Sequence, residues 1–429
     1  MKNLFAYVFL MAGALSMLTA CSSDGENEPG GNHPVAPGDG LQTKTYTDAD
    51  GLSLSVDDEP VIGQTVTFTP AAGGTGTVTI AGAPFDFDGM MMDAGDNNGQ
   101  AFVIPTASVI PGSASVSFPV VLSGGEDGYS FDGTASSNYC TFTYAGSVAA
   151  DTMVLNISNI ALKDASMAGF YEMPDLLEYN ETWETEEPDM YNVVRLKWVS
   201  EKGVPVDFGM GVPMEYPIES ILGITFMMPM IDNGSGEPQS LVSVLHGMLK
   251  GVTLGADGSV TAKYVDAATG EEVDSHKGFA RYVVADDHTL RLFVDPAAII
   301  KSTVANAAKS RSVDMNALFQ GLMDQVVPML ANGVPVNYGP CIADADGNIE
   351  ENPDAVSFYL GTETLLPILK VVSPVFADQD MIDLIVGIAS QDPNMGAMAG
   401  MLPGILQALP DVIGTTSRIE LGINLNKVS

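Results

Sequence analysis

The side chains that most often carry catalysis are scarce in this chain, and their spacing fits no catalytic motif. The histidines are His33, His246, His276 and His288. No two of them have the separation of a metal-ligating pair such as His-x-x-x-His, and the chain has no Cys-x-x-Cys pair. It also lacks the Gly-x-Ser-x-Gly elbow and the Ser-x-x-Lys pair of serine enzymes. We therefore expect a protein that is not an enzyme and that holds no metal and no cofactor.

Carboxylates are abundant, but no pattern among them selects a site. The 54 Asp and Glu residues offer many carboxylate pairs of the kind that glycosidases use, so a hydrolase is the less favoured alternative. Two acidic loops, Asp86–Gly99 and Asp344–Asn348, contain possible Ca²⁺ ligands, and the first adds Met thioethers. Neither has the spacing of an EF-hand loop. We interpret the first as a flexible loop and the second as a hairpin turn.

Cys21 is the residue whose context predicts a definite chemistry. Lys2 precedes an apolar run, Leu4–Leu15, and the sequence Leu-Thr-Ala-Cys follows at Leu18–Cys21. A basic start, a short apolar run and small residues at the cleavage point are typical of a secretory signal. The run is too short to span a bilayer. Because the last four residues match the lipobox of bacterial lipoproteins, we expect residues 1–20 to be a lipoprotein signal peptide and Cys21 to be acylated, anchoring the chain to a membrane.

Residues 21–40 are predicted to be an acidic Gly/Pro tether. Ser22–Glu28 is acidic and Pro29–Gly40 is rich in Pro, Gly and Asn, so the segment has almost nothing to bury in a core. An acidic cluster directly after the lipidated Cys resembles the export signal of Bacteroidetes lipoproteins. That resemblance implies an outer-membrane protein exposed on the cell surface. The alternative is a solvated linker on a periplasmic lipoprotein.

Composition excludes one class of partner. The chain has 429 residues, 46% of them apolar, and a formal charge of -37. Proteins that bind nucleic acid carry a basic face, and no basic run occurs here, so we expect no nucleic-acid partner. Besides Cys21 there are Cys140 and Cys341, which either form a disulfide or are two buried thiols.

Residues 41–165 are predicted to be an all-β domain, either a β-sandwich or a calycin-like barrel. Apolar and polar residues alternate with the period of a strand, and Gly-rich turns separate the runs. The alternating runs are Leu52–Val56, Thr65–Thr69, Thr77–Ile80, Ala114–Phe118, Cys140–Tyr144 and Val154–Ile157.

Residues 166–190 are predicted to be an acidic linker. Glu178–Asp189 carries five Glu and one Asp without a basic residue, and like charges in a block resist packing. Trp183 lies in this block. It is a candidate stacking platform for a ligand such as a sugar, or a side chain packed against the neighbouring domain.

Residues 191–429 are predicted to be an α+β domain with apolar helices. Strands are expected at Tyr191–Val199, Val252–Leu254, Ser259–Val265, Ala280–Val294 (with a turn at Asp286–His288) and Arg418–Leu425. Helical spacing occurs at Leu241–Leu249, Met315–Val327, Thr364–Ser373, Met381–Ala389 and Met398–Leu409. Gly203–Gly209 is echoed by Gly333–Gly339, each followed by helices and a strand, which predicts a possible internal duplication.

The last of these helices could line a ligand site. Met side chains adapt to irregular space and varied ligands, and ligand pockets are mostly apolar. We therefore name Met398, Met401, Ile405 and Leu409 as candidate ligand-binding residues. The alternative is that these helices cover a sheet and form an ordinary core. Six Pro and Asp residues interrupt the region, so no run is long enough to span a membrane.

Several short segments of the β region resemble those of a known protein family. They are Gly51–Val56, Thr67–Pro70, Ile110–Ser113, Tyr129–Gly133 and Phe142–Gly146. They are similar to a family of uncharacterised lipoproteins of gut Bacteroidales, and the β part resembles the calycin-like barrels common in that group. The resemblance carries no functional residues to this chain.

The function expected from these features is binding at the cell surface. We predict an outer-membrane lipoprotein that binds a hydrophobic or amphipathic small ligand without catalysis. The alternative is a carbohydrate- or protein-binding surface component, with loops of the β domain and Trp183 as the contact.

Overall fold

The computed structural model of the chain describes residues 41–86, 103–104, 106–125, 128–176, 193–206, 212–229, 231, 239–266, 269–294, 329, 331–341, 352–389 and 400–428. The predictions for Cys21, the signal and tether, Trp183 and Met398 concern residues outside these ranges. The same holds for the helix predicted at Met315–Val327, the loop Asp344–Asn348 and most of Asp86–Gly99.

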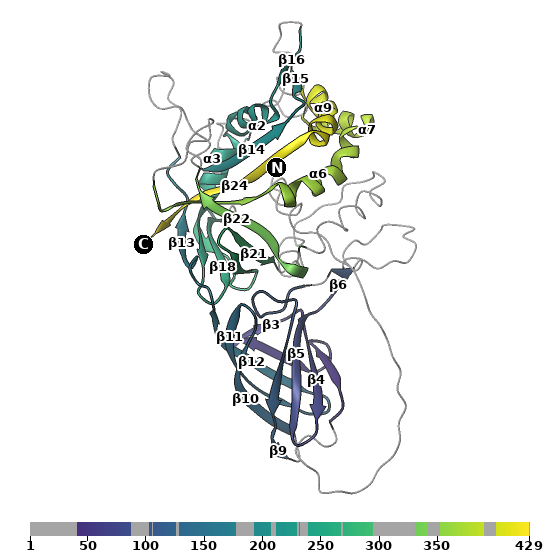
Figure 1. Ribbon diagram of the computed structural model, residues 1–429, viewed down its shortest axis with the longest axis vertical. Coiled ribbons are helices and arrows are strands. Elements are labelled where there is room, and N and C mark those ends of the chain that lie inside the picture. The colour runs from purple at the N-terminus through teal and green to yellow at the C-terminus, as the bar shows by residue number, and fades with distance from the viewer. Residues whose placement is uncertain are drawn as a thin grey trace.

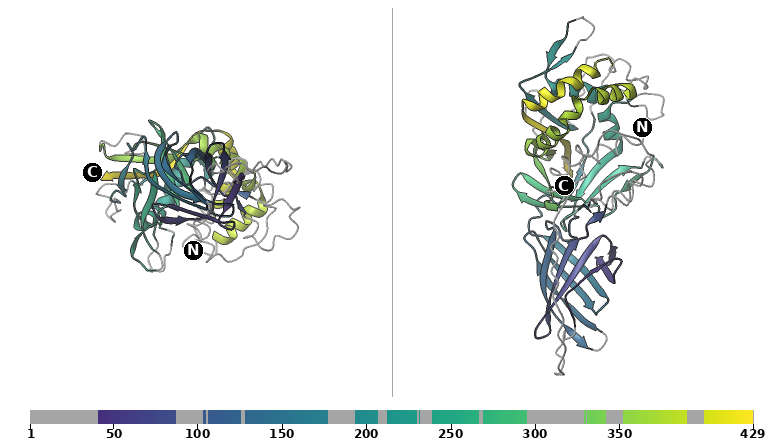
Figure 2. Two further views of the ribbon diagram at one scale, coloured as in Figure 1. Left: turned by 90° about the horizontal axis from the view of Figure 1, so that it is seen from below. Right: turned by 90° about the vertical axis from the view of Figure 1, so that its right-hand side faces the viewer.

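The molecule is elongated and mostly β, with a two-sheet sandwich at one end and helices at the other (Figures 1 and 2). The first sheet of the sandwich has the order β1 (Lys44–Thr47), β4 (Gln64–Ala71), β5 (Thr75–Gly82), β8 (Ser115–Val121). The second has the order β3 (Glu59–Val61), β2 (Leu52–Val56), β12 (Met153–Leu162), β11 (Cys140–Val148), β10 (Gly128–Ser136), β9 (Ser123–Gly125). A short pair, β6 (Phe85–Asp86) and β7 (Val103–Ile104), completes this part.

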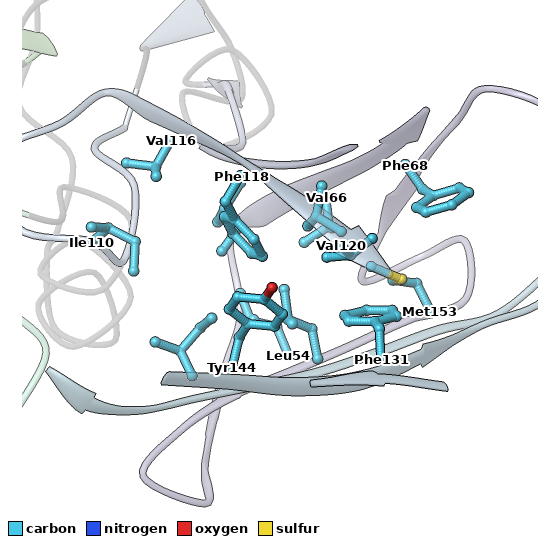
Figure 3. Close-up of a cluster of buried hydrophobic side chains, with 14 of the residues drawn as sticks. Leu54, Val66, Phe68, Ile110, Val116, Phe118, Val120, Phe131, Tyr144 and Met153 are labelled. Carbon is cyan, nitrogen blue, oxygen red and sulfur yellow. The ribbon is translucent and has the colours of Figure 1, made fainter. Parts of the chain in front are cut away.

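The alternation seen in the sequence builds the core between the two sheets. Along β8 every second residue is buried, which points Val116, Phe118 and Val120 inward. Phe118 meets Tyr144 of the opposite sheet with ring centroids 4.5 Å apart, and the two rings face each other in Figure 3. All six predicted strand runs of this region are therefore confirmed.

Eight strands of the described chain after residue 168 form a closed antiparallel barrel. Their order is β13 (Gly169–Glu172), β17 (Leu249–Leu254), β18 (Ser259–Val265), β20 (Ala280–Asp286), β21 (Thr289–Val294), β22 (Val334–Pro340), β23 (Ala355–Leu360), β24 (Thr416–Val428). The barrel closes where β13 pairs with β24, with Phe170 opposite Val428 and Glu172 opposite Asn426. A short strand, β19 (Glu272–Asp274), pairs with β18.

The barrel interior is filled with side chains. Tyr171 and Tyr282 are fully buried there, together with Leu254, Leu290 and Leu425. The ring of Tyr171 meets Phe358 edge to face, with centroids 5.2 Å apart.

The strand β24 extends beyond the barrel and carries the helical end. Its first half pairs with β14 (Val194–Ser200), and helices pack on this ribbon. The helices are α2 (Ile218–Met227), α3 (Leu241–Met248), α6 (Thr362–Phe376), α7 (Gln379–Ala389) and α9 (Leu402–Gly414). A hairpin of β15 (Val204–Val206) and β16 (Met214–Tyr216) projects at this end, where Figure 1 shows it beside α9. Within the described residues, no helix is long and apolar enough to cross a membrane.

Trp198, Val204, Ile221, Val412 and Ile419 form a second apolar cluster in this part of the chain, hereafter the helical cluster. These residues come from three strands and two helices that are distant in the sequence. The cluster gives the amphipathic helices an apolar surface to cover, as their periodicity requires.

The position of the barrel corrects the sequence interpretation. Residues 41–165 were predicted to be a β-sandwich or a calycin-like barrel; the region forms two separate sheets, as in the sandwich alternative, and the closed barrel is built by later residues. The barrel also begins inside the segment predicted to be a linker, because β13 lies at Gly169–Glu172 and Tyr171 is fully buried. The acidic block of that segment lies outside the described residues.

The internal duplication is not confirmed. The first copy, from Gly203, forms β15 of the projecting hairpin, whereas the second, from Gly333, forms β22 inside the barrel. Gly333 also adopts a φ of 82°, in the left-handed region, and Gly203 does not. Two similar phrases therefore take different backbone conformations and different neighbours.

Candidate functional site

A groove of about 550 Å³ runs along one face of α6, hereafter the α6 groove. It is lined by Thr362, Glu363, Leu366, Pro367, Lys370 and Val371. Apolar side chains form its middle, and a carboxylate and an ammonium group lie at positions 363 and 370. A molecule with an apolar body and a polar end matches this distribution, because pockets take orientation from a few polar groups in an apolar wall.

Two prolines inside α6 change the hydrogen bonding beside the groove. Pro367 and Pro374 have no backbone N–H. Glu363 and Lys370 lie four residues earlier in each case and line the α6 groove, so their carbonyls have no N–H donor at the i+4 position.

Contacts with the barrel fix the start of α6. The hydroxyl of Thr362 accepts from the backbone N–H of Ile419 at 2.9 Å, and it lies 3.2 Å from the carbonyl of the same residue. The amide of Asn337 on β22 donates to the Glu363 carboxylate at 2.8 Å. These bonds hold one end of the groove against two barrel strands. Lys370 forms no ion pair with any residue in the described ranges.

Three of the candidate ligand residues named from the sequence lie together on α9 or just before it. Met401, Ile405 and Leu409 are half-buried and pack against the helical cluster. Leu406, between them in sequence, is itself buried. These residues therefore contribute to the packing of α9, and the groove with a mixed lining lies on the neighbouring helix α6. Leu366, Lys370 and Val371, which line this groove, were not among the candidate ligand residues named from the sequence.

A second groove, of about 420 Å³, lies where the sandwich meets the barrel, hereafter the seam groove. The sandwich contributes Gly112, Asn138 and Tyr139, and the barrel side contributes Arg291, Phe293 and Asn332. No motif joins these residues, which span 220 positions of sequence. Only the fold brings them together.

Three tyrosines of the barrel interior differ in how their hydroxyls are satisfied. Tyr171 donates to the carbonyl of Met167 at 2.9 Å, and Tyr338 donates to that of Asp286 at 3.1 Å. The hydroxyl of Tyr282 is buried and has no hydrogen-bond partner among the described residues. Burial raises the pKa of Tyr171 to about 12 and also raises the pKa of Tyr282 and Tyr338. All three phenols are therefore protonated at neutral pH.

The chemistry of the remaining candidates is structural. Cys140 and Cys341 are both buried thiols and are not joined by a disulfide. Burial raises the pKa of the Cys140 thiol, which disfavours the reactive thiolate. His246 bonds to the carbonyl of Pro174 at 3.0 Å. Among the described residues, no group of three or more His, Cys, Asp or Glu side chains is placed to hold a metal ion.

Comparisons with protein-family models, with curated proteins and with solved structures found no match for this chain.

Proposed function

We propose that this protein is a lipid-anchored outer-membrane protein, exposed on the cell surface, that binds a hydrophobic or amphipathic small molecule without catalysis. The observation that carries the proposal is the lining of the α6 groove. Leu366, Pro367 and Val371 provide an apolar floor, and Lys370 provides a charge that no described residue neutralises. An anionic amphipath places its chain on the floor and its head at the ammonium group.

The path of the chain supports an anchored arrangement. Strand β1 runs antiparallel to β4, with Lys44 opposite Phe68, so the described chain begins toward the Ala71 end of β4. The barrel contacts the opposite end of the sandwich, near Pro111 and Leu162. The described chain thus begins at the sandwich end of the molecule, and α6, which bears the groove, lies in the part farther from that end (Figure 1). The tether of residues 21–40 adds a reach of up to about 70 Å.

Ligand binding is tested by titration with 8-anilinonaphthalene-1-sulfonate, an apolar fluorophore with an anionic group. We expect saturable fluorescence enhancement by the folded protein. Val371→Glu places a negative charge on the groove floor and is expected to weaken dye binding at least tenfold. The matched control is Val121→Glu, because Val121 is 69% exposed on β8 of the sandwich, distant from the groove.

Two results would contradict the assignment of the α6 groove. Dye enhancement that does not saturate, or equal loss in both variants, would place dye binding elsewhere. The denaturation midpoint of each variant is measured in parallel, so that lost binding is separated from lost folding. Lys370→Gln is expected to weaken dye binding while leaving the denaturation midpoint unchanged, since this side chain is exposed.

Anchoring is tested separately by cell fractionation. Cys21→Ala is expected to release the protein from membranes, and Ser22→Ala, which keeps the lipobox cysteine, is expected to leave it bound. Changing Asp24, Glu26 and Glu28 to Ala is expected to remove the protein from the reach of protease added to intact cells. Unchanged protease sensitivity would mean that the acidic stretch is only a spacer.

A further inference from the structure

The seam groove has a lining unlike the rest of the chain. The protein carries 54 acidic and 17 basic residues, yet none of the described residues that line this groove is an Asp or Glu, and one is an arginine. A wall that lacks carboxylates in so acidic a protein does not repel an anion at short range. Its volume of about 420 Å³ lies within the range of small-molecule sites, about 300–1,000 Å³.

Arg291 presents most of its hydrogen-bonding capacity to the groove. Its Nη1 donates to the carbonyl of Asn332 at 3.1 Å, which fixes the direction of the side chain. A guanidinium group has five N–H donors, so donors beyond this bond are available to a ligand. Within the described residues Arg291 forms no ion pair. A planar fork with free donors matches a carboxylate, which it can bind with two parallel hydrogen bonds.

Tyr139 supplies an aromatic surface on the opposite wall. Its ring lies against Gly112, where a Cβ would meet the ring Cγ at 2.8 Å. The backbone N–H of Tyr139 donates to Ser137 Oγ at 3.2 Å, and its carbonyl accepts from Lys163 N at 2.8 Å. The Tyr139 backbone is thus held by two hydrogen bonds and its ring lies against Gly112, and the residue is half-buried. Aromatic faces of this kind pack against the apolar C–H face of a pyranose ring.

One further polar group lines the groove, and a second cation lies near it. Asn138 is exposed and has an amide that both donates and accepts, as sugar hydroxyls require. Lys163 places its ammonium group 2.5 Å from the carbonyl of Ser137, directly before Asn138 in sequence. A second cation is thus held on the sandwich side, where it adds to the attraction for an anion.

We propose that the seam groove binds a sugar that carries a carboxylate, with Arg291 on the carboxylate, Tyr139 beneath the ring and Asn138 on its hydroxyls. This site is separate from the α6 groove, and neither assignment depends on the other. An aromatic wall distinguishes a sugar acid from a simple anion, and the arginine distinguishes it from a neutral sugar.

Isothermal titration of the full mature chain with D-glucuronate, D-glucose and inorganic phosphate tests the proposal. We expect saturable binding of glucuronate, with glucose and phosphate each at least tenfold weaker. Arg291→Gln is expected to weaken glucuronate binding at least tenfold and to leave glucose binding unchanged. Arg291→Lys keeps the charge without the fork, so an intermediate loss is expected. Tyr139→Leu is expected to weaken glucuronate with little change in its salt dependence.

Lys44→Gln is the matched control for charge. Like Arg291→Gln, it removes one positive charge from the protein. Lys44 lies on β1 of the sandwich, away from the seam, so glucuronate binding should not change. Circular dichroism and the denaturation midpoint identify any variant that fails to fold, and Arg291→Lys then carries the test. Undetectable glucuronate binding, equal binding of phosphate, or an unaffected Arg291→Gln variant would each overturn the proposal.

Discussion

The guanidinium group of Arg195 lies over the ring of Tyr359, with its central carbon 4.0 Å from the ring centroid. The two residues are on strands that do not pair with each other at these positions. Both are opposite Gly422 of the strand between them, Arg195 from β14 and Tyr359 from β23. The absence of a side chain at position 422 lets the cation and the aromatic ring meet across β24.

A side chain at position 422 should therefore destabilise the ribbon that carries the helices. In Gly422→Ala the new Cβ would meet the carbonyl oxygen of Phe358 and would lie 2.5 Å from Tyr359 Cα. Both are backbone atoms that cannot move aside, so we expect a loss of about 1–3 kcal/mol in the free energy of unfolding. Gly339→Ala on β22 is the control, because nothing lies within 4 Å of its Cβ. Denaturant titration that gave equal stability for both variants would contradict this account.

The carboxylate of Glu420 joins two arginines, and its loss should be costly. Its Oε2 accepts from Arg195 Nε at 2.8 Å and its Oε1 accepts from Arg418 Nε at 2.7 Å. Arg195 and Glu420 are each only 7% exposed, so Glu420→Ala leaves a buried cation without its anion. We expect a loss of about 3–5 kcal/mol in the free energy of unfolding.

An exposed ion pair provides the comparison for Glu420. Asp50 pairs with Lys44 at 3.5 Å, but its side chain is 61% exposed. Asp50→Ala should cost less than about 1 kcal/mol, because solvent screens such pairs. If both substitutions cost the same, the burial of the Arg195–Glu420 pair would not be what stabilises it.

The local elements were predictable because side-chain period is a local property. Alternation identified the sandwich strands, and the turn residues Asp286–His288 identified one barrel hairpin, which the structure contains. Helical spacing placed α3, α6 and α7 within a few residues of their bounds. Each of these signals is contained in fewer than about 20 residues of sequence.

Barrel closure could not be predicted in the same way. It depends on the pairing of β13 with β24, whose residues Tyr171 and Lys427 are 256 positions apart. The four residues of β13 stand beside a strongly acidic block, and that block suggested a linker. The side-chain periodicity of a strand does not specify which distant strand it pairs with. The sequence therefore left a sandwich and a barrel open as alternatives for residues 41–165, and it did not assign the closed barrel to the later residues that form it.

The two grooves escaped prediction for a related reason. A high density of apolar residues in the sequence marks the buried side of a helix as strongly as it marks a ligand site. Met401, Ile405 and Leu409 satisfy that signal by packing on the helical cluster. For the seam groove, Tyr139 and Arg291 have no shared local pattern.

The unpartnered hydroxyl of Tyr282 leads to a counterintuitive expectation. This hydroxyl is buried and bonds to no partner in the part of the chain that the structure describes, so removing it in Tyr282→Phe relieves a desolvation penalty. We expect the free energy of unfolding to stay the same or to rise. Tyr171→Phe is the matched change on the same interior. It breaks the 2.9 Å bond to Met167 and leaves that carbonyl without this donor, so a loss of about 0.5–1.5 kcal/mol is expected. Denaturant titration of both variants decides; a destabilised Tyr282→Phe would show that its hydroxyl has a partner, such as a buried water.

Asp257 should make the stability of the barrel depend on acid pH. Burial pushes its pKa upward, but the ion pair with Lys277 at 2.7 Å and hydrogen bonds from Ser259 outweigh burial and hold the pKa below its ordinary value. A carboxylate with a lowered folded-state pKa contributes stability above its unfolded pKa, about 3.9, and loses it as the pH falls through the folded value.

The variant Asp257→Asn removes this dependence. At pH 7 we expect it to be less stable than the wild type by up to about 1 kcal/mol, since Lys277 is largely exposed and screened. The difference should shrink as the pH falls below about 4, where the unfolded carboxylate is protonated. Unfolding measured at several pH values checks this. A difference that is constant from pH 7 to pH 3 would exclude the charge of Asp257 as its cause.

Gly112 lies at the junction between sandwich and barrel. Comparing its replacement with that of Gly73 separates backbone strain from a steric clash. Gly112 has a φ of 81°, and a Cβ there would meet the Tyr139 ring on one side and Val283 Cγ1 at 3.0 Å on the other. Gly112→Ala therefore combines backbone strain with a clash across the junction. Gly73 has a φ of 79° but nothing within 4 Å of its Cβ, so Gly73→Ala carries the strain alone.

We expect Gly73→Ala to cost about 1–2 kcal/mol and Gly112→Ala to cost about 1–3 kcal/mol more, the range for an overpacked contact. The excess should fall when Val283→Ala is combined with Gly112→Ala, because the smaller side chain makes room on the barrel side. A double-mutant cycle in denaturant measures this coupling directly.

Because Gly112 and Tyr139 also line the seam groove, Gly112→Ala should weaken glucuronate binding as well, whereas Gly73→Ala should not. Equal costs for the two glycine variants, with no coupling to Val283, would mean that the contact between sandwich and barrel contributes nothing to stability at this point.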